Sequence, residues 1–192
     1  MQSTNLANSE KLDLSIPISN TSVVSFGLGL LPTLPFVIPF GILWGWRAPL
    51  QAAGSLLGTI GLFWLALLGG IIVHELLHGF TWMVASRNSP QAMTFGVNWT
   101  TLTPYAHSQA PMRAWAYRLG VVMPGLLLGF APMLAGLANG NGWLFYFGVI
   151  FTIGAGGDFL ILWLMRQVGS HQLVADHPEN VGCFVYTGLN KT

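Results

Sequence analysis

The feature that most constrains this chain is the apolar stretch from Ala53 to Ala85, in which Glu75 is the only fully charged side chain. At a rise of about 1.5 Å per residue, a helix of this length crosses a hydrocarbon core of about 30 Å. Charged residues make up 7% of the chain and apolar residues 53%, which leaves too little polar surface to coat a water-soluble particle. We therefore expect an integral membrane protein.

Three further apolar stretches are long enough to cross a membrane, namely residues 23–46, 119–137 and 143–165. The first contains Pro32, Pro35 and Pro39, which remove backbone donors and predict a bent span covered by neighbouring helices. In the stretch 119–137, Gly125 and Gly129 are four residues apart, a spacing that lets another helix approach closely.

The polar segment between the second and third spans alternates in hydropathy around residues 93–100, which favours an extended or hairpin-like loop. The predicted fold class is an all-α integral membrane protein with about four transmembrane helices and this central loop. We divide the chain into a polar and mobile N-terminal tail (1–22), a membrane-embedded domain (23–166) and a polar C-terminal tail (167–192).

The distribution of positive charge predicts the orientation, because Lys and Arg near span ends are retained in the cytoplasm. Four spans place both termini and the central loop on one side, and that side carries six of the seven basic residues: Lys11, Arg87, Arg113, Arg118, Arg166 and Lys191. The opposite side carries Arg47. We expect cytoplasmic termini, and a net charge of +1 without a basic run excludes a nucleic-acid partner.

A metal-binding pattern lies in the second span, where His74-Glu75-Leu76-Leu77-His78 matches H-E-x-x-H. His74 and His78 are one helical turn apart on the same face, so both imidazoles can bind one Zn²⁺ ion. In this pattern the glutamate, here Glu75, takes a proton from the water that the zinc ion activates. Ionisable side chains are costly inside a membrane helix and usually mark a function.

A catalytic zinc ion needs a third protein ligand and an open position for water. Asp158 is the best candidate, because it is the only other carboxylate inside a predicted span and lies at the same inferred depth as the two histidines. We expect the glycines before it to let the fourth span approach the second. Weaker candidates in polar loops are His107, His171, Asp176 and His177, with His177 the main alternative to Asp158. Cys183 is the single cysteine, so a thiolate-rich site is excluded.

The ordered motifs resemble the putative zincin peptidase family of bacterial membrane proteins. They are His-Glu-Leu-Leu-His-Gly at 74–79, Pro-Tyr-Ala-His at 104–107, Gly-Gly-Asp at 156–158 and Asp-His-Pro at 176–178, leading to Gly182 and Cys183. The resemblance covers residues 56–186. That family is similar in layout to the site-2 protease clan of intramembrane metalloproteases. The resemblance implies that His74, His78 and Asp158 bind zinc, that Glu75 is the catalytic base, and that the protein lies in the bacterial inner membrane.

These observations predict a membrane-embedded zinc metalloendopeptidase that cuts a membrane-protein or peptide substrate in or near the bilayer. The alternative is a non-catalytic protein that binds or transports a metal ion with the same cluster. Such a carrier needs no base at Glu75 but needs ligands along a path across the membrane, and the outer halves of the spans hold none. A third hypothesis, a scaffold in which the cluster only joins helices, predicts no metal.

Overall fold

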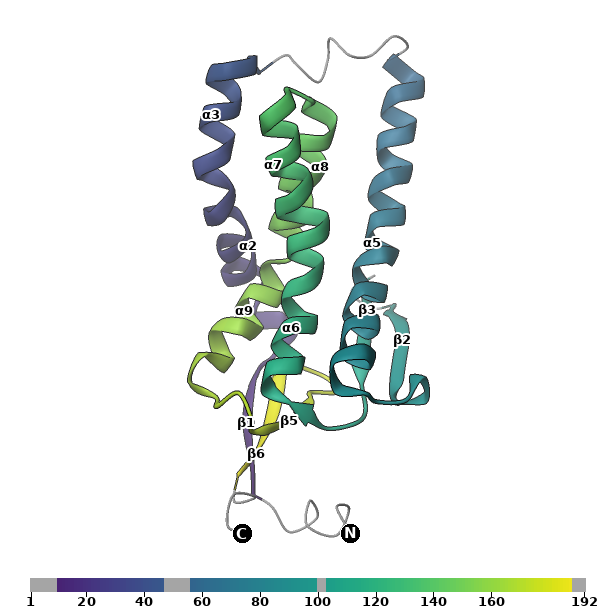
Figure 1. Cartoon of the computed structure of the whole chain (residues 1–192), viewed down its shortest axis with the longest axis vertical. Helices are drawn as coiled ribbons and strands as arrows, with labels where there is room; N and C mark the ends of the chain where they lie inside the picture. Colours follow the sequence, from purple (N-terminus) through teal and green to yellow (C-terminus); the bar gives the residue numbers. More distant parts are fainter. Residues whose placement is uncertain (1–9, 47–55, 100–102, 188–192) are drawn as a thin grey trace.

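The computed structural model describes residues 10–46, 56–99 and 103–187. Long helices run along the longest axis of the molecule, and a small antiparallel sheet lies at one end of them (Figure 1). The helices follow the four predicted apolar stretches, and the sheet brings together segments from the two ends of the chain.

The first apolar stretch forms α2 (Ser22–Leu30), the 3-10 turn η2 (Leu31–Thr33) and α3 (Leu34–Trp44). Pro32 lies in the 3-10 turn and the helix continues through Pro39, so the stretch forms one helix, Ser22–Trp44, with a 3-10 turn at the first of its prolines and not the predicted covered bend. The second stretch forms one uninterrupted helix, α5 (Leu56–Ser86).

The third stretch begins earlier than predicted and consists of three helical segments. These are α6 (Ala114–Pro124), the π-helical segment η4 (Gly125–Phe130) and α7 (Ala131–Asn139). The fourth forms α8 (Gly142–Gly154), α9 (Gly156–Leu164) and the 3-10 turn η5 (Met165–Gln167). The chain bends by 42° between α8 and α9.

Three of these helical stretches are long and apolar enough to cross a membrane, namely Ser22–Trp44, Ile60–Ser86 and Ala114–Asn139. The bent pair α8–α9 makes a fourth if it is counted as one span. The prediction of about four apolar spans therefore agrees with the helices that the chain forms.

The prediction of an all-α chain is wrong at the sheet. Strands β1 (Glu10–Ile16), β6 (Val181–Thr187), β5 (Leu173–Asp176) and β4 (Met112–Arg113) lie in this order and are all antiparallel. Parts of both segments that we assigned to polar tails are thus ordered as strands. Their pairing joins residues about 170 positions apart, as in Leu14 with Cys183, and no local pattern reveals such a partner.

The central loop contains the 3-10 turn η3 (Pro90–Ala92) and a hairpin of β2 (Met93–Asn98) with β3 (Thr103–Ser108). Met93 pairs with Ser108 and Asn98 with Thr103, so the predicted hairpin-like loop is confirmed. The short turn η1 (Ile18–Asn20) links β1 to α2. In Figure 1 the hairpin lies beside α5 at the end of the molecule that carries the sheet.

Two clusters of buried side chains form the core. The larger joins α6 and the sheet through Tyr117, Met165, Val174 and Cys183. The smaller consists of Phe40, Met133 and Phe145, and the rings of Phe40 and Phe145 stack with centroids 4.0 Å apart. Most apolar side chains of α3 and α5 lie outside these clusters and are exposed.

Glycines allow close helix contacts at several positions. A Cβ atom at Gly129 would press on Thr152, and one at Gly125 would contact Ala155 and Phe159, so the predicted close approach at these two glycines is confirmed. A Cβ atom at Gly156 would collide with the Ser25 backbone. The last contact corrects a prediction, because Gly156 brings α9 against α2 and not against α5.

The contact between Gly156 and α2 can be tested with a neighbouring glycine as control. We expect Gly156→Ala to lower the free energy of unfolding by about 1–3 kcal/mol, because the added methyl group overpacks a backbone contact. Gly157→Ala lies in the same helix with open space around its Cβ position and should leave stability nearly unchanged. Denaturation in detergent micelles measures the free energy of unfolding of both variants. Equal stability of the two would contradict this packing.

Candidate metal centre

The two histidines of the H-E-x-x-H pattern project from one face of α5. Their ring centroids are 4.9 Å apart, and the rings lie edge to face at 77°. His78 is buried and His74 is partly buried. The two imidazoles therefore lie as far apart as one turn of the helix places them.

Asp158 reaches the two imidazoles from the first turn of α9. Its Oδ2 lies 3.2 Å from Nε2 of His74 and its Oδ1 lies 3.3 Å from Nε2 of His78. The bend after Gly154 redirects the chain just before this residue. The structure thus brings together the three side chains predicted as metal ligands, and each offers one ligand atom within 4.8 Å of the others.

These separations fit a zinc ion. Ligand atoms about 2.0–2.1 Å from one zinc in tetrahedral geometry lie about 3.3 Å from each other. Asp158 Oδ2 is buried and has no hydrogen-bond partner among the described residues, although His74 Nε2 lies nearby. A buried acceptor without a donor is costly, and a cation between these atoms would satisfy it.

A backbone carbonyl orients the second histidine. His78 Nδ1 donates a hydrogen bond to the Gly120 carbonyl of α6 at 2.9 Å. This contact places the ring proton on Nδ1 and turns the lone pair of Nε2 toward Asp158. Zinc-binding histidines are commonly held in this way by a carbonyl behind the ring.

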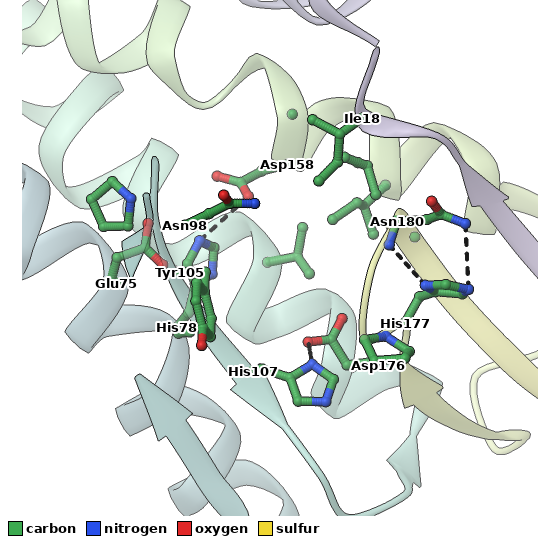
Figure 2. Close-up of a pocket in the computed structure, with 18 of the residues that line it drawn as sticks. Ile18, Glu75, His78, Asn98, Tyr105, His107, Asp158, Asp176, His177 and Asn180 are labelled. Atoms are coloured by element: carbon green, nitrogen blue, oxygen red, sulfur yellow. Dashed lines mark hydrogen bonds and ion pairs between the residues drawn. The ribbon is translucent and has the colours of Figure 1, made fainter. Parts of the chain in front are cut away.

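Glu75, the predicted base, lies beside the cluster and faces the hairpin. The backbone of Ala106 in β3 hydrogen-bonds its carboxylate. Figure 2 shows Glu75 near His78 and Tyr105 on the wall of the same cavity. The strand therefore fixes the carboxylate next to the candidate metal ligands.

The cluster opens into a cavity of about 660 Å³ where α5, α9, the hairpin and the sheet meet. Its wall includes the cluster, Glu75, and a second polar group formed by His107, Asp176 and Tyr117. A volume of this size accommodates a short peptide segment or a ligand of similar size.

The weaker candidate ligands lie outside the three-residue cluster. His107 Nδ1 donates to Asp176 Oδ2 at 2.8 Å. His177 Nδ1 accepts hydrogen bonds from the backbone N–H groups of Glu179 and Asn180, so its ring stabilises the turn before β6. His171 is exposed in a turn. Among the described residues, only His74, His78 and Asp158 have the spacing of a metal site.

Cys183 is buried on β6, and burial raises the pKa of its thiol to about 12. Asp176 nearby adds to this rise. The thiol therefore stays protonated near neutral pH and is not available as a thiolate ligand.

Two aromatic residues that support the site were not predicted. Trp82 stacks on His78 with ring centroids 5.4 Å apart, and Tyr117 stacks on Trp82 at 5.3 Å. Trp82 follows His78 by four residues on the same helix face, a signal that the sequence contains. Tyr117 and the Gly120 carbonyl lie on another helix, so nothing in the local pattern links them to the motif.

The helical fold, the His-His-Asp cluster and the adjacent glutamate define a zincin-like class of protein. A sequence profile of the family described as putative zincin peptidase matches residues 67–173, which include all four of these residues. The chain belongs to this family. No curated protein and no solved structure matches the chain significantly.

The His107–Asp176 pair predicts a pH-dependent contribution to stability. The hydrogen bond and charge of Asp176 raise the pKa of His107 despite the opposing effect of burial. A raised pKa means that this stabilisation is complete below the unfolded value of about 6.5 and is lost as the pH rises through the folded value.

We expect Asp176→Asn to lower the pKa of His107 and to destabilise the protein more at pH 6 than at pH 9. The asparagine side chain still offers an oxygen to the Tyr117 hydroxyl, so the variant removes the charge and keeps that acceptor. NMR titration of histidine ring protons and melting curves at both pH values measure the two effects. A pKa of His107 that is the same in both proteins would rule out the pairing.

Proposed function

We propose that this chain is a membrane-embedded zinc metallopeptidase that hydrolyses peptide bonds in or near the bilayer. One observation carries the proposal: two imidazole nitrogens and a carboxylate converge at zinc-ligand spacing beside Glu75, on the wall of one cavity. Three protein ligands leave the fourth position of a tetrahedral ion open, as catalytic zinc sites require. Membership of the putative zincin peptidase family supports the same chemistry.

His74, His78 and Asp158 would hold the ion, and Glu75 would act as the base. A bound zinc ion supplies a Lewis acid that lowers the pKa of water to about 7 and polarises a carbonyl group. Glu75 accepts the proton of the attacking water and then passes it to the leaving amine nitrogen. The Ala106 backbone keeps the carboxylate in place for both transfers.

The substrate must be extended at this site, because the backbone groups of a helix are engaged in their own hydrogen bonds. The hairpin β2–β3 lies beside α5, and several of its residues line the cavity. An unwound segment of a membrane protein or peptide would add to this hairpin as a further strand, which provides backbone hydrogen bonds without selecting a sequence.

Exposed apolar side chains support the membrane location. Along α5, large side chains on several faces are more than half exposed: Leu62, Trp64, Leu65, Leu68, Ile72, Phe80 and Val84. A helix that is apolar all round is stable in lipid and not in water. The basic residues of the described part of the chain lie in β1, directly after α5, in β4, in the first half of α6 and in η5: Lys11, Arg87, Arg113, Arg118 and Arg166. These elements lie at the end of the molecule that carries the sheet (Figure 1).

Metal transport is the less favoured function. A carrier needs successive ligand sites across the membrane, whereas the described residues contain a single cluster with metal-ligand spacing. That cluster lies on α5 and on the first turn of α9, and α9 lies toward the end of the molecule that carries the sheet in Figure 1.

The metal content and activity of purified variants test the peptidase proposal. We expect wild type to bind about one zinc ion and to cleave dye-labelled casein, an unfolded protein with many accessible peptide bonds. His74→Ala and Asp158→Ala should lose zinc, while Glu75→Gln should keep it and lose about 100-fold or more of the activity, because general bases contribute about 10²–10⁴-fold. Elemental mass spectrometry measures the zinc content of each variant, and dye release measures its peptidase activity. Unchanged hydrolysis by Glu75→Gln, or a metal-free wild type after zinc supplementation, would contradict the proposal.

Reporter fusions test the membrane orientation separately. A fusion at Thr192 should report the cytoplasm, and one at Gly140, in the turn between α7 and α8, should report the opposite side. Fused alkaline phosphatase is active only outside the inner membrane. Fused green fluorescent protein fluoresces only when it stays in the cytoplasm. The reverse pattern, or one side for both positions, would show that the proposed four-span topology is wrong.

A further inference from the structure

The two candidate histidine ligands differ in how their rings are held. The ring centroid of His74 lies 6.4 Å from that of Phe151, and the described part of the chain supplies no hydrogen-bond partner for its Nδ1. His78 has both kinds of contact: its Nδ1 donates to the Gly120 carbonyl at 2.9 Å, and Trp82 stacks on its ring with centroids 5.4 Å apart. The orientation of His78 is therefore fixed more closely than that of His74.

The hydrogen bond and the stacked ring restrict different motions of the His78 imidazole. A hydrogen bond at one ring nitrogen still lets the ring tilt about that contact. The indole of Trp82 lies 21° from parallel to the imidazole, at a centroid separation within the range of about 4.5–7 Å in which aromatic rings stack, and it opposes the tilt. The lone pair of Nε2 lies in the ring plane. The tilt therefore decides whether this lone pair points toward Asp158, whose Oδ1 lies 3.3 Å from Nε2.

Trp82 is itself held in place by helix α6. Its side chain is 3% exposed, and its indole N–H donates to the Tyr117 carbonyl at 3.0 Å. The ring of Tyr117 stacks on the indole with centroids 5.3 Å apart and planes 5° from parallel. A Cβ atom at Gly120 would collide with the indole, so the glycine provides the space that the ring occupies. The surface against which His78 stacks is thus rigid.

The other end of the same stripe of α5 lacks an aromatic side chain. Gly70, His74, His78 and Trp82 follow one another at a spacing of four residues, so they lie along one face of the helix. A Cβ atom at Gly70 would collide with the ring of Phe151, which comes from α8. Helix α5 therefore supplies a stacking ring for His78 alone.

We propose that Trp82 is a positioning residue of the metal centre. It acts through His78, because its indole holds the plane of the imidazole so that Nε2 points at the metal position. This inference rests on the metal-binding part of the function proposed above and does not require that the bound ion hydrolyse a peptide. It assigns part of the metal affinity to a residue outside the H-E-x-x-H pattern and outside the three candidate ligands.

Zinc affinity of the full-length protein in detergent micelles tests the proposal. Trp82→Leu keeps an apolar side chain but removes the flat ring, and we expect it to weaken zinc binding by about 10–100-fold, as the loss of groups that orient metal-binding histidines typically does. Trp82→Phe keeps a ring on His78 and loses only the N–H bond to Tyr117, so its affinity should stay within about 3-fold of wild type. Competition with a chelating dye, after removal of metal and reloading with zinc, measures the dissociation constants.

The visible absorption spectrum of the Co²⁺-loaded protein gives a readout that a purely structural role would not change. The absorption bands of Co²⁺ depend on the directions of its ligands. We expect Trp82→Leu to shift or weaken these bands and Trp82→Phe to retain them. Trp64→Leu is the matched control, because it makes the same substitution on the same helix at a side chain that is 61% exposed. This control should leave both the zinc affinity and the Co²⁺ spectrum unchanged.

The outcomes separate this inference from the proposed function. A folded Trp82→Leu with the affinity and spectrum of wild type overturns the inference, and so does a Trp82→Phe that loses as much affinity as Trp82→Leu. If Trp82→Leu has no melting transition, Gly120→Ala decides: it keeps the carbonyl that binds His78 while its methyl group displaces the indole, and wild-type affinity then overturns the inference. A wild type that binds no zinc overturns the metal centre and this inference together. A zinc-loaded wild type that cleaves nothing overturns the peptidase function alone.

Discussion

The rest of the site depends on the contact between a carboxylate on α9 and two imidazoles on α5. Asp158 turns both oxygens toward ring nitrogens, and the ring proton of His78 is already directed at the Gly120 carbonyl on the other side. With that proton used, the lone pair of His78 Nε2 faces a carboxylate oxygen in a buried place, an arrangement that is unfavourable unless a positive charge, carried by a second ring proton or by a bound cation, lies between the two atoms. Helices α5 and α9 therefore meet at a place that favours positive charge, and the bend before Asp158 is the backbone feature that brings the carboxylate there.

Helix α6 connects the His-His-Asp cluster to the opposite wall of the cavity. Its Gly120 carbonyl orients His78, and three residues earlier its Tyr117 hydroxyl holds Asp176. Both contacts lie on the side of α6 that packs against Trp82, whose ring is inserted between His78 and Tyr117. Gly120 must lack a side chain here, because a Cβ atom would collide with the indole ring. A single helix face thus sets the distance between the candidate ligands and the His107–Asp176 pair.

Local patterns in the sequence were sufficient for the helices and for the centre of the site. The spacing of His74 and His78 places both on one helix face, and the scarcity of charge within the spans left Asp158 as the best partner, which the structure brings to them. The sheet was missed because its pairing depends on contacts such as Leu14 with Cys183, between segments that are short and lie far apart in the sequence. The packing of Gly156 was assigned to the wrong helix for a related reason: a glycine indicates a close approach but not the partner. Tyr117 was missed because its role depends on Trp82 and Asp176, which lie on two other elements.

The sheet that the sequence did not predict also bears on how the proposed hydrolytic site would work among apolar helices. Hydrolysis consumes water, and hydrocarbon holds almost none, so non-helical backbone at this depth is stable only where protein covers it or where it lines a water-filled cavity. Here the hairpin and the strands β5 and β6 close one side of a 660 Å³ cavity whose other side is formed by α5 and α9. The helices supply the His-His-Asp cluster, while the strands supply the Ala106 backbone that binds Glu75 and polar side chains on the cavity wall. Under the proposed function, a peptide that leaves the lipid and unwinds at this boundary would exchange its helical hydrogen bonds for those of the hairpin, at the place where Glu75 and the candidate ligands lie.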